Sequence, residues 1–193
     1  MKKGFTIVEV SILFVIFLIV AMLVAPLSLD DTRQARSTSR WRNVQQDFAN
    51  INYSVNTLIK EEESSYKEAF DETLSNEIQG TLKPYKMTFM NGTLPNTTYR
   101  FTDYNLTYSG AVVATKIFEN AENSDLIGLI LYDVNGKSGP NVWGKDVFGL
   151  NVYRDRFEPF CKEKSLNEQK EDCSKKGSGL CCSNYYLLGG SFE

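Results

Sequence analysis

The sequence contains no histidine in its 193 residues. Histidine is the commonest general acid–base residue and the commonest metal ligand, so its absence disfavours a catalytic site and a histidine-bound metal. Serine and aspartate are plentiful, but they form no recognisable pairing of a nucleophile with a base. We therefore expect a protein that is not an enzyme and that requires no cofactor.

Cysteine is also absent from most of the chain, and its four occurrences are Cys161, Cys173, Cys181 and Cys182. Without histidine, only a four-cysteine zinc site is available, and this spacing fits one poorly. Two disulfides fit better and imply an oxidising compartment. Pairing Cys181 with its neighbour Cys182 would be strained, so we expect Cys161 and Cys173 each to take one of them. The spacing leaves open which, and a redox function would prefer a C-x-x-C motif that is absent.

An excess of positive charge is missing as well. Lysine and arginine total 21 against 24 acidic residues, a net charge of −3. This balance gives no reason to expect a nucleic-acid partner. The local cluster of Arg33, Arg36, Arg40 and Arg42 could contact nucleic acid or anionic lipid, but a solvated or subunit-facing surface is the simpler interpretation.

Charged residues are missing altogether from Val10 to Leu29. At about 1.5 Å per helical residue, this stretch would be about 30 Å long, which matches the hydrocarbon core of a bilayer. The run is longer than a signal peptide's, and Ala21 and Ala25 are not spaced as a small-x-small cleavage site. We predict a transmembrane helix over residues 5–29, and Lys2 and Lys3 favour a cytoplasmic N-terminus. The carboxylate of Glu9, just before this stretch, needs a partner there.

The order of residues at the start, Lys3-Gly4-Phe5-Thr6-Ile7-Val8-Glu9, resembles the processing site of type IV pilins and of the pseudopilins of type II secretion. The resemblance covers about residues 1–30 and includes a short basic leader, a glycine before the cut, a phenylalanine after it and a glutamate five residues into the processed chain. Pro26 also falls where many pilins carry a proline.

This resemblance implies a leader of residues 1–4, cleavage after Gly4 by a prepilin peptidase and N-methylation of Phe5. It assigns Glu9, Thr6 and Pro26 to filament assembly, with Glu9 pairing with the Phe5 amine of a neighbouring subunit. The implied location is the bacterial inner membrane with the folded domain in the periplasm, and then a pilus or pseudopilus. The implied partners are other pilin-like subunits, the inner-membrane assembly platform and membrane lipid.

Two functions are consistent with the resemblance. The first is a structural subunit of a type IV pilus or type II secretion filament. The alternative is a minor pilin that acts as a binding module in adhesion, DNA uptake or recognition of a secreted substrate. Nothing in the sequence separates a pilus from a secretion or competence system.

Beyond the membrane stretch, the apolar residues continue at helical spacing. Trp41, Val44, Phe48, Ile51, Val55 and Leu58 follow one another at intervals of three and four residues, which puts them on one helix face. We therefore expect residues 30–58 to continue the helix as the spine of a domain. Pro26 lacks an amide hydrogen and should kink or loosen the helix near residues 22–26.

Residues 59–193 are predicted to form a globular pilin-like domain of the α+β class, in which an antiparallel sheet packs on the spine. A connecting segment, 60–85, contains a short helix from Tyr66 to Ile78. The sheet spans 86–155, and a cysteine tail, too polar to bury much surface, spans 156–193. The predicted strands are Met87–Met90, Thr98–Thr102, Ala111–Phe118, Leu126–Tyr132 and Val147–Tyr153. Tyr185 to Leu188 would add a last strand or dock on the sheet.

The stretch between the last two strands, residues 133–146, is rich in oxygen-bearing side chains and glycine. Asp133, Asn135, Asn141 and Asp146 could supply ligands to calcium, which takes six to eight oxygens. The spacing is not that of an EF-hand, although calcium-stabilised loops do occur in pseudopilins. The simpler alternative is a long hairpin connection, because Asn-Gly and Gly-Pro are turn formers.

Overall fold

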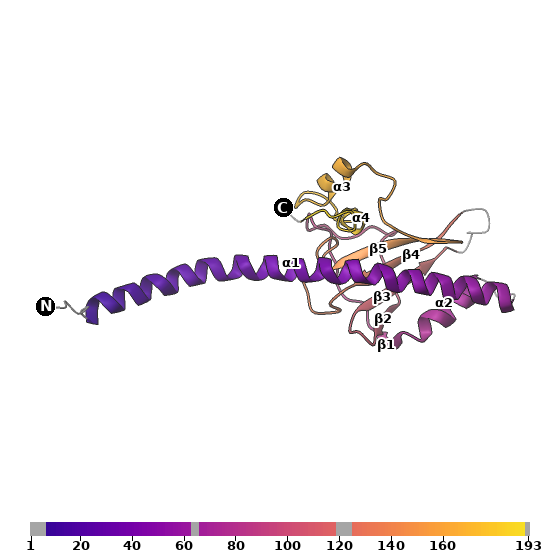
Figure 1. The fold of residues 1–193 in the computed structure, drawn as a ribbon, viewed down its shortest axis with the longest axis horizontal. Helices are drawn as coiled ribbons and strands as arrows, with labels where there is room; N and C mark the ends of the chain where they lie inside the picture. Colours follow the sequence, from indigo (N-terminus) through magenta and orange to yellow (C-terminus); the bar gives the residue numbers. More distant parts are fainter. Residues whose placement is uncertain (1–6, 63–65, 119–124, 192–193) are drawn as a thin grey trace. The chain divides into compact units, whose positions relative to one another are not determined.

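The computed structural model describes residues 7–62, 66–118 and 125–191, without the side chains at 23–30, 45, 60–62, 66 and 67. The fold is α+β, with helices, a six-stranded antiparallel sheet and a disulfide-bonded C-terminal region (Figure 1). The chain divides into two compact units, Met1–Arg36 and Ser37–Glu193.

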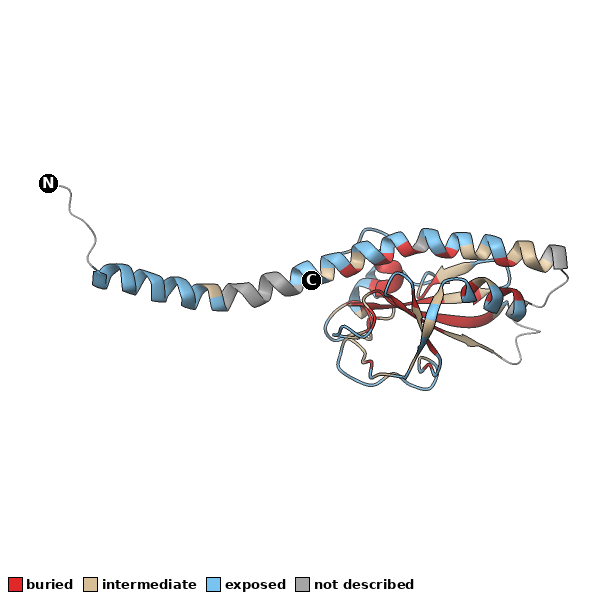
Figure 2. Ribbon diagram, turned by 90° about the horizontal axis from the view of Figure 1, so that it is seen from below, coloured by how far each residue is buried: buried red, intermediate tan, exposed pale blue. Residues whose placement is uncertain are grey.

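The first helix, α1 (Ile7–Glu62), confirms the expectation of one long helix. In the second unit, its predicted apolar stripe faces the sheet (Figure 2). Trp41, Val44, Phe48 and Val55 are buried, and Ile51 and Leu58 pack against them. Burial of each large side chain stabilises by roughly 1.5–3 kcal/mol before conformational entropy is subtracted.

The sheet is a meander in which each strand pairs with its neighbours in the sequence. Its strands are β1 (Ile78–Leu82), β2 (Tyr104–Thr107), β3 (Val112–Ile117), β4 (Leu126–Asp133), β5 (Val147–Tyr153) and β6 (Phe157–Pro159). The strands β3, β4 and β5 confirm the three predicted from apolar, β-branched runs. Both edge strands lie outside the predicted sheet range of 86–155.

Three local predictions were wrong. The helix α2 (Tyr66–Ser75) ends before Ile78, which instead opens β1. Residues 87–90 form only an isolated bridge, between Thr88 and Val142. Residues 98–102 form no strand, because the Asn96 side chain accepts hydrogen bonds from the backbone amides of Thr98 and Tyr99 and turns the chain there.

The two faces of the sheet are covered by different parts of the chain. On one face, α1 and α2 close the core, and the Trp41 ring stacks on Phe148 with centroids 4.8 Å apart. On the other face, the loop between β1 and β2 supplies Met87 and Phe101. Side-chain alternation along β4 places Leu129 and Leu131 on this second face.

The cysteine tail buries more surface than its composition suggested. It contains two short helices, α3 (Leu166–Asp172), which opens on a capping box between Ser165 and Glu168, and α4 (Cys182–Tyr185). Tyr186 is fully buried in the core beneath α1. Residues 185–188 therefore dock on the folded unit, one of the two expected alternatives, and form no strand, whereas β6 lies at the start of the tail.

The tail is also bonded directly to α1. The Trp41 indole donates to the Ser183 carbonyl at 2.7 Å, and the Arg42 guanidinium donates to the Tyr186 carbonyl at 2.8 Å. Arg40 donates to the Val134 carbonyl at 3.0 Å. Two of the four clustered arginines therefore bind backbone carbonyls of their own unit.

Candidate functional site

The four residues proposed as calcium ligands lie together in the structure. Asp133 ends β4, Asp146 immediately precedes β5, and Asn135 and Asn141 lie in the loop between them. Because β4 and β5 are antiparallel neighbours, with Asp133 opposite Val147, the two carboxylates come from the two ends of one hairpin connection. We call Asp133, Asn135, Asn141 and Asp146 the carboxylate centre.

Asp146 organises the loop. Its side chain is 1% exposed, and its oxygens accept hydrogen bonds from the backbone amides of Asn141 at 2.8 Å and Val142 at 2.7 Å. The side-chain amide of Asn135 donates to the same carboxylate at 3.3 Å. These bonds stabilise a backbone in which Asn141 has a left-handed φ of 53°, a conformation that asparagine tolerates.

Asp133 lies inside an apolar layer. It shares a face of β4 with Leu129 and Leu131, its strand neighbours are Val112 and Val147, and it is fully buried. One side-chain oxygen accepts a hydrogen bond from the Tyr85 hydroxyl at 2.7 Å. The other accepts one from the backbone amide of Asn135 at 3.2 Å.

These environments shift the pKa values of the buried groups. Burial, reinforced by the charge of Asp146, raises the pKa of Asp133 to about 7. Burial also raises the pKa of Asp146, although the amides of Val142 and Asn141 oppose the shift. Burial and the neighbouring Asp133 charge raise the pKa of Tyr85. Burial disfavours the ionised form of both carboxyl groups, the charge of Asp146 adds to this effect at Asp133, and a divalent cation would stabilise the ionised forms.

One amide side chain indicates where a cation would fit. Asn135 has a buried side-chain oxygen with no hydrogen-bond partner among the described residues. The Asn141 side chain is oriented so that its nitrogen donates to the Gly136 carbonyl at 3.0 Å and to Asp133 at 3.2 Å.

The donor set suits a hard cation. Carboxylate, amide and carbonyl oxygens are the ligands that calcium prefers, whereas softer metals prefer nitrogen and sulfur. The described part of the chain contains no cluster of three or more His, Cys, Asp and Glu side chains that could hold a metal. A cation at the carboxylate centre would therefore depend on amide and backbone oxygens as well as on Asp133 and Asp146.

The loop is attached to three other parts of the unit. The Trp143 amide donates to the Thr88 carbonyl at 3.0 Å, the Tyr186 hydroxyl donates to the Gly144 carbonyl at 3.1 Å, and Arg40 holds Val134. The hydrogen bond from Tyr85 to Asp133 was not predicted from the sequence. Tyr85 lies 48 residues from Asp133, and no local pattern connects the two.

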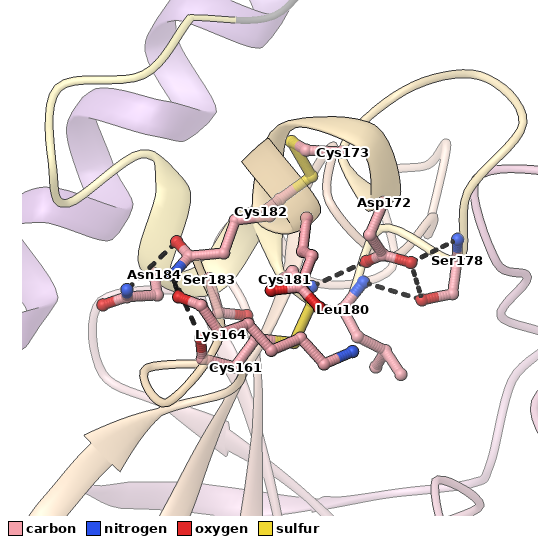
Figure 3. The surroundings of a disulfide bond; sticks show 12 residues. Cys161, Lys164, Asp172, Cys173, Ser178, Leu180, Cys181, Cys182, Ser183 and Asn184 are labelled. Atoms are coloured by element: carbon pink, nitrogen blue, oxygen red, sulfur yellow. Dashed lines mark hydrogen bonds between the residues drawn. A yellow bond between two sulfur atoms is a disulfide. The ribbon is translucent and has the colours of Figure 1, made fainter. Parts of the chain in front are cut away.

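The disulfides resolve the pairing that the sequence left open. Cys161 pairs with Cys181, and Cys173 pairs with Cys182. Figure 3 shows how the intervening loop is held: the Asp172 carboxylate accepts the Ser178 amide and hydroxyl and the Cys181 amide, at 2.9, 2.7 and 2.9 Å. The two bridges therefore fasten the tail beside the 133–146 loop, where Cys182 lies against Gly144.

The predicted processing and assembly residues are only partly described. Gly4, Phe5 and Thr6 lie outside the described residues, as do Lys2 and Lys3. Glu9 lies in the first turn of α1, where a carboxylate is favoured by the helix dipole. Helical backbone continues through Pro26, whose side chain is not among those described.

The apolar side chains that the structure describes in the first unit are exposed around the helix, from Ile7 at 86% to Met22 at 74% (Figure 2). Within the described residues, no helix meets the length and apolarity needed to cross a membrane.

Comparison with known proteins identifies no relative: no family model, no curated protein and no solved structure matches this chain.

Proposed function

We propose that this chain is a structural subunit of a type IV pilus or of a type II secretion filament, built into it through α1. The observation that carries the proposal is the apolar surface of α1 between Ile7 and Met22, which is exposed on all sides of the helix. A helix that is apolar all round needs an apolar environment. Membrane lipid supplies one before assembly, and the same helices of neighbouring subunits supply one in the filament.

Glu9 has a physical role in this proposal. After cleavage behind Gly4, the N-methylated amine of Phe5 would carry a positive charge. Pairing that charge with Glu9 of a neighbouring subunit gives each buried charge an opposite partner, the condition under which such groups are tolerated. Thr6 and Pro26 belong to the same assembly segment. The prepilin peptidase and the inner-membrane assembly platform are the partners that this route requires.

The second unit would then be the body that each subunit presents outside the inner membrane. Its two disulfides fit an oxidising compartment such as the periplasm. Its stripe on α1 is already used to close its own core, so that face of the helix is not available to other subunits.

We also propose that the carboxylate centre binds calcium. The proposal is supported by the unpartnered Asn135 oxygen and by the raised pKa values of both carboxyl groups. Calcium would stabilise the 133–146 loop by neutralising two buried carboxylates, a structural role with no part in any reaction.

Intact mass measurement of the protein from its membrane tests the filament proposal. The expected mass corresponds to a chain that begins at Phe5 and carries one methyl group. Deletion of the prepilin peptidase should restore the four-residue leader. A mature chain that keeps Met1, or one cut near Ala25, would overturn the proposal.

A further inference from the structure

The connection between β1 and β2, residues 83–103, is long for a segment with no helix or strand of its own. Loops longer than about 15 residues are uncommon in compact domains, and ordered ones usually carry function. This loop is ordered by packing: Met87 and Phe101 are buried in the core, and the Tyr99 ring meets Phe160 with centroids 5.5 Å apart. The loop therefore has a defined surface that can recognise a ligand.

That surface contains a pocket of about 220 Å³. Its walls are mainly aromatic and prolyl, with Tyr85 and Tyr104 in ring contact at 5.2 Å on one side and Leu94, which is 58% exposed, among its lining residues. The volume suits one apolar or aromatic group, and exposed apolar surface of this kind marks interaction sites.

The charge of this segment is mainly positive. Lys86 and Arg100 line the pocket, Lys83 lies next to it in sequence, and the one carboxylate of residues 83–103, Asp103, is not among the lining residues. Both lining cations are exposed, and neither forms an ion pair within the described residues. In a chain with a net charge of −3, this local excess of positive charge favours an acidic ligand.

Two contacts with the core fix the walls of the pocket. Tyr85, one of its walls, donates its hydroxyl to the buried Asp133, and Tyr99 packs edge-on against Trp143. Walls that are fixed before a ligand arrives lower the entropic cost of binding.

We propose that this pocket binds an acidic segment of a partner protein, with one aromatic or prolyl side chain inserted among the tyrosines and flanking carboxylates paired with Lys86 and Arg100. Tyrosine- and proline-lined pockets suit such side chains. A single-stranded nucleic acid would use a longer basic track with successive stacking platforms, whereas this surface offers one pocket and few cations. The inference does not depend on filament assembly, and it would make the subunit a binding module as well.

The test uses the full chain in detergent micelles and an array of immobilised peptides. Each peptide has a central tyrosine, phenylalanine or proline pair, flanked either by glutamate and aspartate or by lysine. The rim variant, Lys86→Glu with Arg100→Glu, is compared with Lys175→Glu with Lys176→Glu, a control that makes the same charge change at exposed positions outside the pocket. Melting curves verify that all proteins are folded.

We expect the unmodified chain and the control variant to retain acid-flanked peptides. The rim variant should bind them about tenfold or more weakly and should gain affinity for the lysine-flanked set. Leu94→Asp should also weaken the acid-flanked set, because it places a charge in the apolar wall.

Three results would overturn the proposal. The first is that the unmodified chain retains no acid-flanked peptide, and the second is that the rim and control variants bind alike. The third is that a single-stranded oligonucleotide or an acidic polysaccharide binds more tightly than every acid-flanked peptide. Peptidase processing and filament formation are measured separately, so a failure here leaves the filament proposal unaffected.

Discussion

The hydroxyl of Tyr85 donates a hydrogen bond of 2.7 Å to a side-chain oxygen of Asp133. This bond joins the loop between β1 and β2 to the end of β4, at a carboxylate that is fully buried. Tyr85 also lines the surface pocket, so the pocket and the carboxylate centre share this side chain. A change in the charge of Asp133 should therefore affect both.

The first prediction concerns pH. The pKa of Asp133 is raised from 3.8 to about 7 in the folded protein, so between these values the folded state binds more protons than the unfolded state. In chelator, the melting temperature should therefore fall as pH rises from 5 to 8. Saturating calcium should raise the melting temperature at pH 8 and flatten this decline, since it stabilises the ionised carboxylates.

Differential scanning calorimetry across this pH range measures both effects. Asp133→Asn is the control, and it should flatten the decline without calcium and abolish the calcium effect. A chelated protein that becomes more stable from pH 5 to 8 would contradict the assignment of Asp133, and no shift at saturating calcium would end the calcium proposal.

The second prediction separates the two carboxylates. Asp146→Asn places an amide nitrogen against one of two backbone amides that now donate to the carboxylate, at Asn141 and Val142. The free energy of unfolding in chelator should fall by about 1–3 kcal/mol. Asp133→Asn removes a buried charge and keeps an acceptor, so at pH 8 it should be neutral or stabilising. Urea denaturation measures the difference, and equal losses in both variants would show that Asp146 has no special role in the loop.

The third prediction tests the disulfide pairing. Peptide mapping cannot separate the alternatives, because Cys181 and Cys182 are adjacent. The pair Cys161→Ser with Cys181→Ser should leave one intact bridge and no free thiol. The mismatched pair Cys161→Ser with Cys182→Ser should leave Cys173 and Cys181 without their native partners.

Alkylation of the folded protein followed by mass measurement counts the free thiols. Loss of either native bridge should lower the free energy of unfolding by about 2–4 kcal/mol. If the mismatched pair is as stable as the matched one and equally free of thiols, the pairing described here is wrong.

The fourth prediction concerns Gly144, which has φ +82° and lies beneath the tail. A Cβ there would lie 2.6 Å from the sulfur of Cys182 and 2.9 Å from the Gly179 carbonyl oxygen. Gly144→Ala should cost roughly 2–5 kcal/mol, the sum of left-handed backbone strain and overpacking. Gly92 has the same φ and open space around it, so Gly92→Ala measures the backbone cost alone, about 1–2 kcal/mol. Chemical denaturation measures the free energy of unfolding of both variants, and the loss should be larger for Gly144→Ala. Similar losses would mean that the tail does not pack closely against Gly144.

The fifth prediction concerns assembly. Glu9→Gln keeps the shape of the side chain and removes its charge, so membrane insertion should persist while filament yield falls. Carbonate extraction measures insertion, and shearing followed by sedimentation measures filaments. Glu9→Asp, which keeps the charge at the same position, is the control and should retain filament yield. Normal filament yield from Glu9→Gln would exclude the proposed charge pair.

Apolar periodicity in the sequence predicted those helices and strands whose own residues favour them. The stripe on α1 and the strands β3, β4 and β5 carry strong apolar periodicity, so their positions followed from the sequence. The edge strand β1 reads Ile-Gln-Gly-Thr-Leu, with little to distinguish it from a loop, and it exists because β2 offers it partners. Thr98–Thr102 has β-prone residues but is bent by Asn96.

The candidate site shows the same division. Asp133 and Asp146 could be expected to meet because a single hairpin connection brings them together. The Tyr85 contact, the choice of disulfide partners and the aromatic pocket all depend on segments distant in sequence that only the tertiary fold brings together. For the same reason, the burial that raises the pKa of Asp133 had no signature in its neighbours along the chain.

The meander order of the sheet has a consequence for how the protein folds. Every strand pairs with the next one in sequence, so the sheet can grow one hairpin at a time, and the long connection between β1 and β2 is closed only when the edge strand β1 joins. The contacts of α1 are the reverse: its Trp41 indole bonds to Ser183, 142 residues away. The helix is therefore synthesised well before the surface that covers it. Its apolar stripe stays exposed until the sheet and the tail have folded. Docking of the helix is therefore a late step, and the chain is most prone to aggregate before it occurs.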